Sequence, residues 1–142
     1  MKASDILQSK GVQVYGVSAS ATVADAVQLL NSENIGAVIV HDTNKKLIGI
    51  LSERDVVRKI GADGAKVLSD AVTDIMTADP FTCGPETELD AMLAKMTDKR
   101  IRHLPIVDAG QVIGVISIGD VVKRKIENAE QEAQALKDYI SA

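Results

Sequence analysis

Apolar residues follow two different periods along the chain, and the same succession of periods occurs twice. Residues 22–30 and 87–96 carry apolar side chains three or four positions apart, the spacing of one helix face. After each stretch come two short aliphatic runs with a polar turn between them, at 37–51 and 104–116, and such paired runs predict a β-hairpin. The alternation of helix and strand patterns predicts a mixed α/β fold.

Two phrases that nearly match show that this succession is a repeat. "ILSERDVV" at 50–57 and "VISIGDVV" at 115–122 lie 65 residues apart. The similarity extends upstream, where "NIGAVIVHDTNKKLIGILS" (34–52) aligns with "RIRHLPIVDAGQVIGVIS" (100–117), and "SDIL" near the start of the chain corresponds to "TDIM". A fixed period of this kind indicates a duplicated supersecondary unit. Each unit is expected to contain a short strand, a helix, two strands and a second helix.

The repeat sets the expected domain boundaries. Residues 3–60 form the first unit, 61–70 a linker containing Gly and polar residues, 71–130 the second unit and 131–142 a helical tail. The last helix is expected to continue from the second unit into this tail, because an apolar stripe runs through it at Ile126, Ala129, Ala133, Leu136 and Ile140.

The first helix of each unit begins with the same pair of residue types. Thr22 is followed by Asp25, and Thr87 by Asp90. A Thr with an acidic residue three positions later is typical of a helix N-terminus, where each side chain bonds the backbone of the other. Both pairs are therefore predicted to cap their helices.

Composition narrows the classes of partner. The 142 residues are 46% apolar and 25% charged, with no Trp, one Phe and two Tyr, and the net charge is −4. These values argue against general attraction to nucleic acid or to an anionic membrane. One cysteine, Cys83, excludes an intrachain disulfide and a multi-cysteine metal site. The N-terminus has no apolar signal-peptide core, and no apolar run approaches the roughly 18 residues of a spanning helix. We expect a cytoplasmic protein with no nucleic-acid, membrane or metal partner.

Three segments carry a resemblance to a known family: "LIGILSERDVV", "IRHLPIVDAGQVIGVISIGDVV" and "DIMTADPFTCGPETELDAM". Over roughly residues 3–130 the chain resembles a tandem pair of cystathionine-β-synthase (CBS) domains, as in stand-alone bacterial pairs and plant mitochondrial single-pair proteins. The resemblance implies two β-α-β-β-α units packed about a pseudo-twofold axis, here with an extended C-terminal helix. It also implies clefts that bind adenosine-containing ligands, and association into a homodimer.

The Ser-x-x-Asp phrases have the chemistry for such a ligand. A helix that begins directly after a strand offers free N–H groups to a phosphate, and the Ser117 hydroxyl is placed to add to them. Asp120, one turn later, is suited to accept hydrogen bonds from ribose hydroxyls. Arg102 supplies a planar fork that matches a phosphate. The family pattern likewise assigns ribose to the Asp, and phosphate to the Ser and to the basic residues before the Pro.

The two halves differ at the basic positions. Where the second unit has Arg102 and His103, the first has Gly36 and Ala37, so the second cleft is the expected principal site. Arg54, inside the first phrase, is expected to reach the phosphate from the other unit. The full expected set is Asp120 and Asp55 for ribose; Arg102, His103, Ser117, Arg54 and Ser52 for phosphate; and Thr82, Cys83, Pro105 and Ile116 around adenine.

These residues also have structural interpretations. Asp55 and Asp120 are the acidic residues that any helix N-terminus favours, His103 is equally suited to a structural role, and Cys83 to a small buried apolar residue. Because the chain has no catalytic sequence motif, we expect a non-enzymatic, energy-sensing regulatory module that binds AMP and modulates an unidentified partner protein. ADP, ATP and NAD(H) share the adenosine and phosphate groups. S-adenosylmethionine binding and a purely structural dimerisation role are the alternatives.

Overall fold

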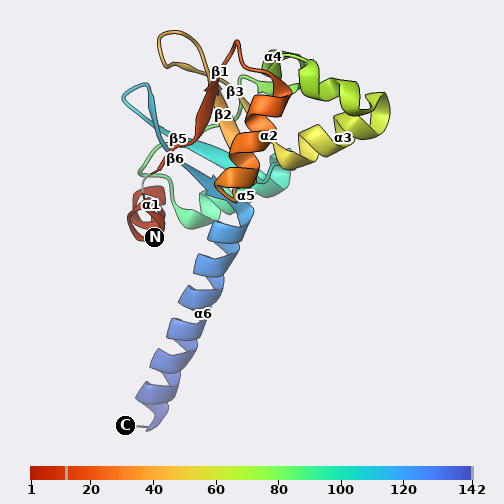
Figure 1. Cartoon of the computed structure of the whole chain (residues 1–142). Helices are drawn as coiled ribbons and strands as arrows, with labels where there is room; N and C mark the ends of the chain where they lie inside the picture. Colours follow the sequence, from red (N-terminus) through yellow and green to blue (C-terminus); the bar gives the residue numbers. More distant parts are fainter. Residues whose placement is uncertain (12, 142) are drawn as a thin grey trace.

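The computed structural model describes residues 1–11 and 13–141 and confirms the mixed α/β fold (Figure 1). Its elements in chain order are α1 (Ala3–Lys10), β1 (Gly16–Ser18), α2 (Val23–Ser32), β2 (Ala37–His41), β3 (Leu47–Ser52), α3 (Glu53–Asp63), the 3₁₀ helix η1 (Ala65–Ser69), α4 (Val72–Ile75), β4 (Thr77–Ala78), α5 (Leu89–Lys99), β5 (His103–Asp108), β6 (Gln111–Ser117) and α6 (Ile118–Ser141).

The strands form one sheet in each half of the chain. In the first sheet the strand order is β1-β2-β3-β4. The β1–β2 pair is parallel, and the β2–β3 and β3–β4 pairs are antiparallel. The second is the antiparallel hairpin β5–β6. The position equivalent to β1 is a single parallel bridge rather than a strand: the Cys83 amide donates to the Pro105 carbonyl at 3.1 Å, and the Val107 amide to the Cys83 carbonyl at 2.8 Å. Both predicted hairpins are confirmed.

Each half has its own apolar core, and the segment that begins each unit packs into the core of the other unit. Leu7 of α1 lies in the core built around α5, β5 and β6, where a Cβ on Gly114 would come within 3.0 Å of its Cδ1. Met76, the equivalent residue, packs against the first core, where a Cβ on Gly49 would come within 2.9 Å of its Cγ. The glycine of each Gly-x-x-Ser phrase is therefore required by core packing.

Contacts between distant parts of the chain also bury part of the predicted linker and fix the start of one helix. Val67, inside the predicted linker, is fully buried in the first core. The Thr22–Asp25 cap is confirmed, with both bonds at 3.0–3.2 Å. The second cap is wrong: α5 begins at Leu89, whose amide donates to the Met1 carbonyl at 2.8 Å, and Asp90 bonds Lys125 instead. The N-terminal segment replaces the expected side-chain cap.

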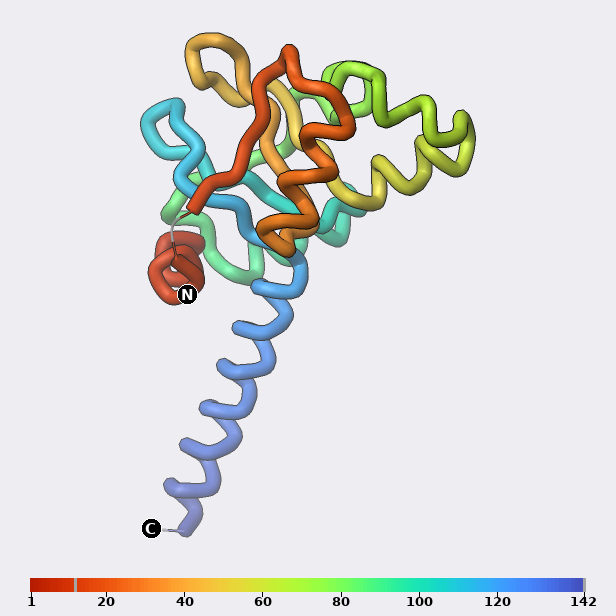
Figure 2. The backbone as a smooth tube through the Cα atoms, viewed as in Figure 1, coloured from red at the N-terminus to blue at the C-terminus, as the bar shows by residue number. Residues whose placement is uncertain are grey.

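The last helix leaves the body of the protein. α6 runs without a break through the predicted tail and projects away from both sheets, so that its C-terminal end lies far from them (Figures 1 and 2). Among residues 1–11 and 13–141, no helix combines the length and apolar character needed to cross a membrane.

Candidate functional site

Two pockets lie where the halves of the chain meet. The first, called here the Arg102 pocket, has a volume of about 370 Å³, and the second, the Ser117 pocket, about 570 Å³. The Arg102 pocket is lined by Ile50, Ser52, Arg54, Asp55, Arg58, Thr77, Pro80, Phe81, Lys99, Arg100, Ile101, Arg102 and His103. The Ser117 pocket is lined by Lys10, Gly11, Gln13, Tyr15, Glu33, Asn34, Ile35, Gly36, Ala37, His103, Val115 and Ser117.

The two pockets are built to the same plan. Each combines the strand-to-helix junction of one repeat with the helix-to-strand junction of the other: Ser52 faces residues 99–103, and Ser117 faces residues 33–37. These junctions are equivalent in the repeat, since the Glu53 amide donates to the Gly36 carbonyl at 2.9 Å and the Ile118 amide to the Arg102 carbonyl at 2.8 Å. The pockets therefore differ in side chains rather than in architecture.

The Ser-x-x-Asp phrases have nearly identical geometry in the two repeats, although Asp55 lines the Arg102 pocket and Asp120 lines neither pocket. The Ser52 amide donates to Asp55 Oδ2 at 3.0 Å, and the Asp55 amide to Ser52 Oγ at 3.2 Å. The corresponding distances for Ser117 and Asp120 are 2.9 and 3.1 Å. Each carboxylate is thus fixed by its own helix start, which leaves its second oxygen, Oδ1, for another donor.

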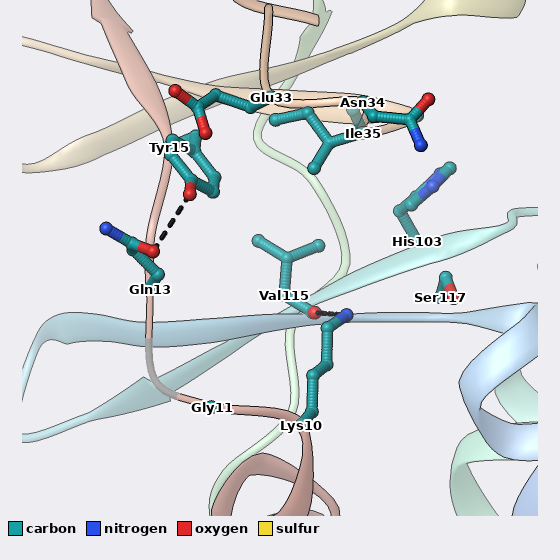
Figure 3. Close-up of a pocket in the computed structure, with 12 residues that line it drawn as sticks. Lys10, Gly11, Gln13, Tyr15, Glu33, Asn34, Ile35, His103, Val115 and Ser117 are labelled. Atoms are coloured by element: carbon teal, nitrogen blue, oxygen red, sulfur yellow. Dashed lines mark hydrogen bonds between the residues drawn. The ribbon is translucent and has the colours of Figure 1, made fainter.

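Beside the Ser117 pocket a second donor already bonds the Asp120 carboxylate, at Oδ2, the oxygen that the Ser117 amide also bonds. Lys10, the last residue of α1, donates from Nζ to Asp120 Oδ2 and, at 2.8 Å, to the Val115 carbonyl. Figure 3 shows its side chain extended along the pocket to Val115, with Tyr15 on the far side bonded to Gln13. Burial raises the pKa of Asp120, but the hydrogen bonds from Lys10 and Ser117 outweigh it, so the pKa lies below its usual value.

The Arg102 pocket has a strong excess of positive charge. Five cationic side chains line it, against the single carboxylate of Asp55; they are Arg54, Arg58, Lys99, Arg100 and Arg102. Within the described part of the chain, no ion pair or side-chain hydrogen bond engages any of the four arginines. Four unpaired guanidinium groups around one cavity are the arrangement that a phosphate or another polyanion would neutralise.

The same pocket has an apolar side. Ile50, Pro80, Phe81 and Ile101 line it, and Phe81 is 45% exposed. The ammonium group of Lys99 lies 5.2 Å from the centre of the Phe81 ring, which keeps the ring at the edge of the cationic cluster. An aromatic and aliphatic surface next to the guanidinium groups suits a ligand with both a flat base and an anionic group.

His103 separates the two pockets and lines both. A Cβ at Gly36 would lie 3.1 Å from His103 Nε2, so glycine leaves the space that the imidazole needs. Burial lowers the pKa of His103, and the nearby positive charge of Lys10 adds to this effect. The imidazole is therefore neutral at pH 7 and can contribute a hydrogen bond rather than a charge.

The structure divides the residues expected to form one principal cleft. Arg102 lines the pocket of Ser52, Arg54 and Asp55, not that of Ser117, because each Ser-x-x-Asp phrase faces the junction of the opposite repeat. Only His103 lies at both. His103, at the start of β5, thus reaches the Ser117 pocket, while its neighbour Arg102 lines the pocket of Ser52 alone.

The residues expected around adenine line neither pocket: Thr82, Cys83, Pro105 and Ile116. Cys83 and Ile116 belong to the core of the second half, and Pro105 is buried in β5. Thr82 accepts a bond from Lys95 through its carbonyl at 2.9 Å. Pro105 and Ile116 lie on β5 and β6, and their side chains, like that of Cys83, fill the interior rather than a pocket.

Sequence reasoning missed several lining residues. Lys99, Arg100, Arg58 and Phe81 line the Arg102 pocket, and Lys10 reaches Asp120 from the N-terminal helix. The cluster "KRIRH" at 99–103 was the available signal, since the equivalent stretch of the first repeat, "ENIGA" at 33–37, has no cation. Lys10 had no such signal, because its contact spans 110 positions.

These features define a duplicated α/β protein with two pseudo-equivalent pockets between its repeats. The chain belongs to the CBS domain family: the CBS domain model matches residues 3–62 and again 72–127. CBS domain proteins are in general regulatory, nucleotide-binding modules.

Individual CBS domain proteins are similar to most of the chain. The chain is 39% identical to the Arabidopsis thaliana CBS domain-containing protein CBSX3, mitochondrial, over 96% of this chain and 70% of that protein. The crystal structure of the CBS-domain containing protein ATU1752 from Agrobacterium tumefaciens superposes with a TM-score of 0.84 at 35% identity, covering 88% of this chain and 99% of that one. CBS domain protein PAE2072 from Pyrobaculum aerophilum, complexed with AMP, has a TM-score of 0.76 at 23% identity, with 84% and 89% covered.

Proposed function

We propose that this chain is a non-enzymatic regulatory module that binds an adenine nucleotide in the Arg102 pocket and thereby alters its interaction with a partner protein. The observation that carries the proposal is the convergence of five cationic side chains, with Asp55 and an apolar wall, in one cavity. The phosphate would lie among Arg54, Arg102 and the helix start at Ser52, and the ribose hydroxyls would donate to Asp55.

Charge selects among the adenosine-containing ligands. AMP, ADP, ATP and NAD(H) all carry the phosphate that the guanidinium groups would neutralise. S-adenosylmethionine carries a sulfonium cation and would be repelled by the same groups. The AMP complex of PAE2072 belongs to that protein, and with the shared fold it makes AMP the first ligand to test.

The Ser117 pocket is proposed as a weaker site. Lys10 already neutralises Asp120, and Glu33 adds a negative charge to the lining, so the pocket offers little net attraction to a phosphate. A homodimer and a cytoplasmic location remain predictions.

The test is a calorimetric comparison of AMP with adenosine. We expect the native protein to bind AMP more tightly, and Arg102→Met to lower the AMP affinity by about tenfold while adenosine changes little. Arg124→Met is the matched control, because Arg124 lies on α6 outside both pockets, and it should leave the ratio unchanged. Equal binding of AMP and adenosine by the native protein would contradict the phosphate assignment. Absence of binding by any adenine nucleotide would favour the structural dimerisation role.

A further inference from the structure

The exposed face of α6 carries an apolar seam with a strict seven-residue repeat. Its members are separated alternately by four and three positions: Val122, Ile126, Ala129, Ala133, Leu136 and Ile140. The four large residues are 42–72% exposed, although α6 is continuous to Ser141. Spacings of this kind, averaging 3.5 residues, place every member on one side of a helix that winds around a partner helix.

The seam faces away from the rest of the chain. Val121 is buried, Arg124 bonds Ser9 of α1, and Asn128 is half-buried. At 100° per residue these positions lie about 100–160° around the helix from the centre of the seam. A partner helix could therefore lie along the seam without contact with the sheets, because α6 extends clear of them (Figures 1 and 2).

We propose that α6 is a dimerisation helix whose partner is α6 of a second copy of this chain, in parallel and in register. The seam residues favour two strands: Ile126 and Ile140 occupy the a positions of the heptad, where β-branched residues suit parallel dimers, and Leu136 occupies a d position. Ala129 and Ala133 form two small central layers that allow the helices to approach closely.

The charges that flank the seam determine the orientation. In a parallel pair, each g position faces the partner's e position five residues further on. Lys125 then faces the partner's Glu130, and Glu132 faces the partner's Lys137, and symmetry makes each attractive pair occur twice. Lys125 also bonds Asp90 at 2.7 Å, but this pair is exposed and so can be exchanged at little cost.

The antiparallel arrangement in which the two seams overlap along their whole length brings like charges together. If Ile126 lay opposite the partner's Leu136, Glu130 would face the partner's Glu130 and Glu132 the partner's Glu132. Lys123 would face the partner's Lys137. Like charges across such a seam are destabilising, so the same residues that favour the parallel pair oppose the alternative.

Two alanines provide a matched test by sedimentation of the full chain. Ala133→Glu places a carboxylate in the seam, whereas Ala135→Glu makes the same change on the opposite face of an equally exposed stretch. We expect a native dimer at tens of micromolar, Ala133→Glu to raise the dimer dissociation constant by more than about tenfold, and Ala135→Glu to have no effect. Far-UV circular dichroism of both variants verifies that α6 still forms.

Orientation is tested by crosslinking. In a parallel dimer two copies of Leu136→Cys meet across the seam and form a disulfide on mild oxidation, whereas in the antiparallel pair they are separated by ten residues, or about 15 Å. The native protein, whose Cys83 is buried, is the control and should not crosslink. A monomeric native protein, a dimer that survives Ala133→Glu, or a dimer in which Leu136→Cys does not crosslink would each overturn the proposal.

Discussion

Replacing Asp55 and Asp120 separately by Asn compares the two candidate ribose carboxylates. The side chains are nearly isosteric, and an amide oxygen can still accept the bond from Ser52 or Ser117, so each helix start is preserved. What each variant loses is the negative charge. The two variants are therefore matched controls for each other.

The structure predicts unequal losses of AMP affinity. Hydrogen bonds from ribose hydroxyls to a carboxylate contribute about 1.5–3 kcal/mol, so Asp55→Asn should weaken AMP binding roughly ten- to hundredfold. A ribose at Asp120 would have to compete with the Lys10 ammonium, a partly exposed ion pair worth about 0.2–1 kcal/mol. That competition is small beside the ribose bonds, so the expectation rests on the lack of cations at residues 33–37 of the Ser117 pocket: AMP should occupy the Arg102 pocket, and Asp120→Asn should change AMP affinity by less than about threefold.

The assay is isothermal calorimetry at physiological ionic strength, where long-range attraction is screened. Thermal unfolding without ligand shows whether either variant is misfolded. A larger loss at Asp120 would refute the assignment of the nucleotide to the Arg102 pocket and restore the cleft that the sequence favoured. Equal losses would mean that both pockets hold ligand.

Two further predictions concern stability. Leu7 is 4% exposed in the core of the second half, so Leu7→Ala should lower the free energy of unfolding by about 2–5 kcal/mol in urea denaturation; a loss no greater than that of the exposed control Gln8→Ala would contradict the crossed packing. The pKa of His103 is lowered from 6.5, so the unfolded chain binds more protons and stability should fall as the pH drops below about 6.5. His103→Gln should weaken this fall, and an unchanged pH dependence would contradict the buried, neutral imidazole.

Local features of the sequence were sufficient to predict most elements. The two hairpins, the Thr22 cap and the length of α6 follow from periodicities and pairs within a few residues. Contacts between residues far apart in the sequence were harder to predict. "SDIL" and "TDIM" match so well that either segment could complete either unit, and nothing local shows that Leu7 packs on Gly114 rather than on Gly49.

The grouping of residues in the expected cleft has the same origin. Arg102 and Ser117 belong to one repeat, and grouping them followed the order of the chain. The structure instead combines the halves of different repeats, which places Arg102 with Ser52 and leaves Gly36 beside Ser117. Alignment of the two repeats shows that Ser52 is equivalent to Ser117 and Gly36 to Arg102. It cannot show whether Arg102 lines the pocket of Ser52 or that of Ser117.

Duplication followed by divergence accounts for the different chemistry of the two pockets. Equivalent positions carry Lys99 and Arg100 on one side and Glu33 and Asn34 on the other, while the backbone bonds of the two junctions are the same. The backbone thus supplies two helix starts and two carboxylates, and the side chains of residues 99–103 decide which pocket attracts an anion. Replacing "KRIRH" by "ENIGA" should therefore remove phosphate selectivity, because the Arg102 pocket would then be almost as poor in cations as the Ser117 pocket.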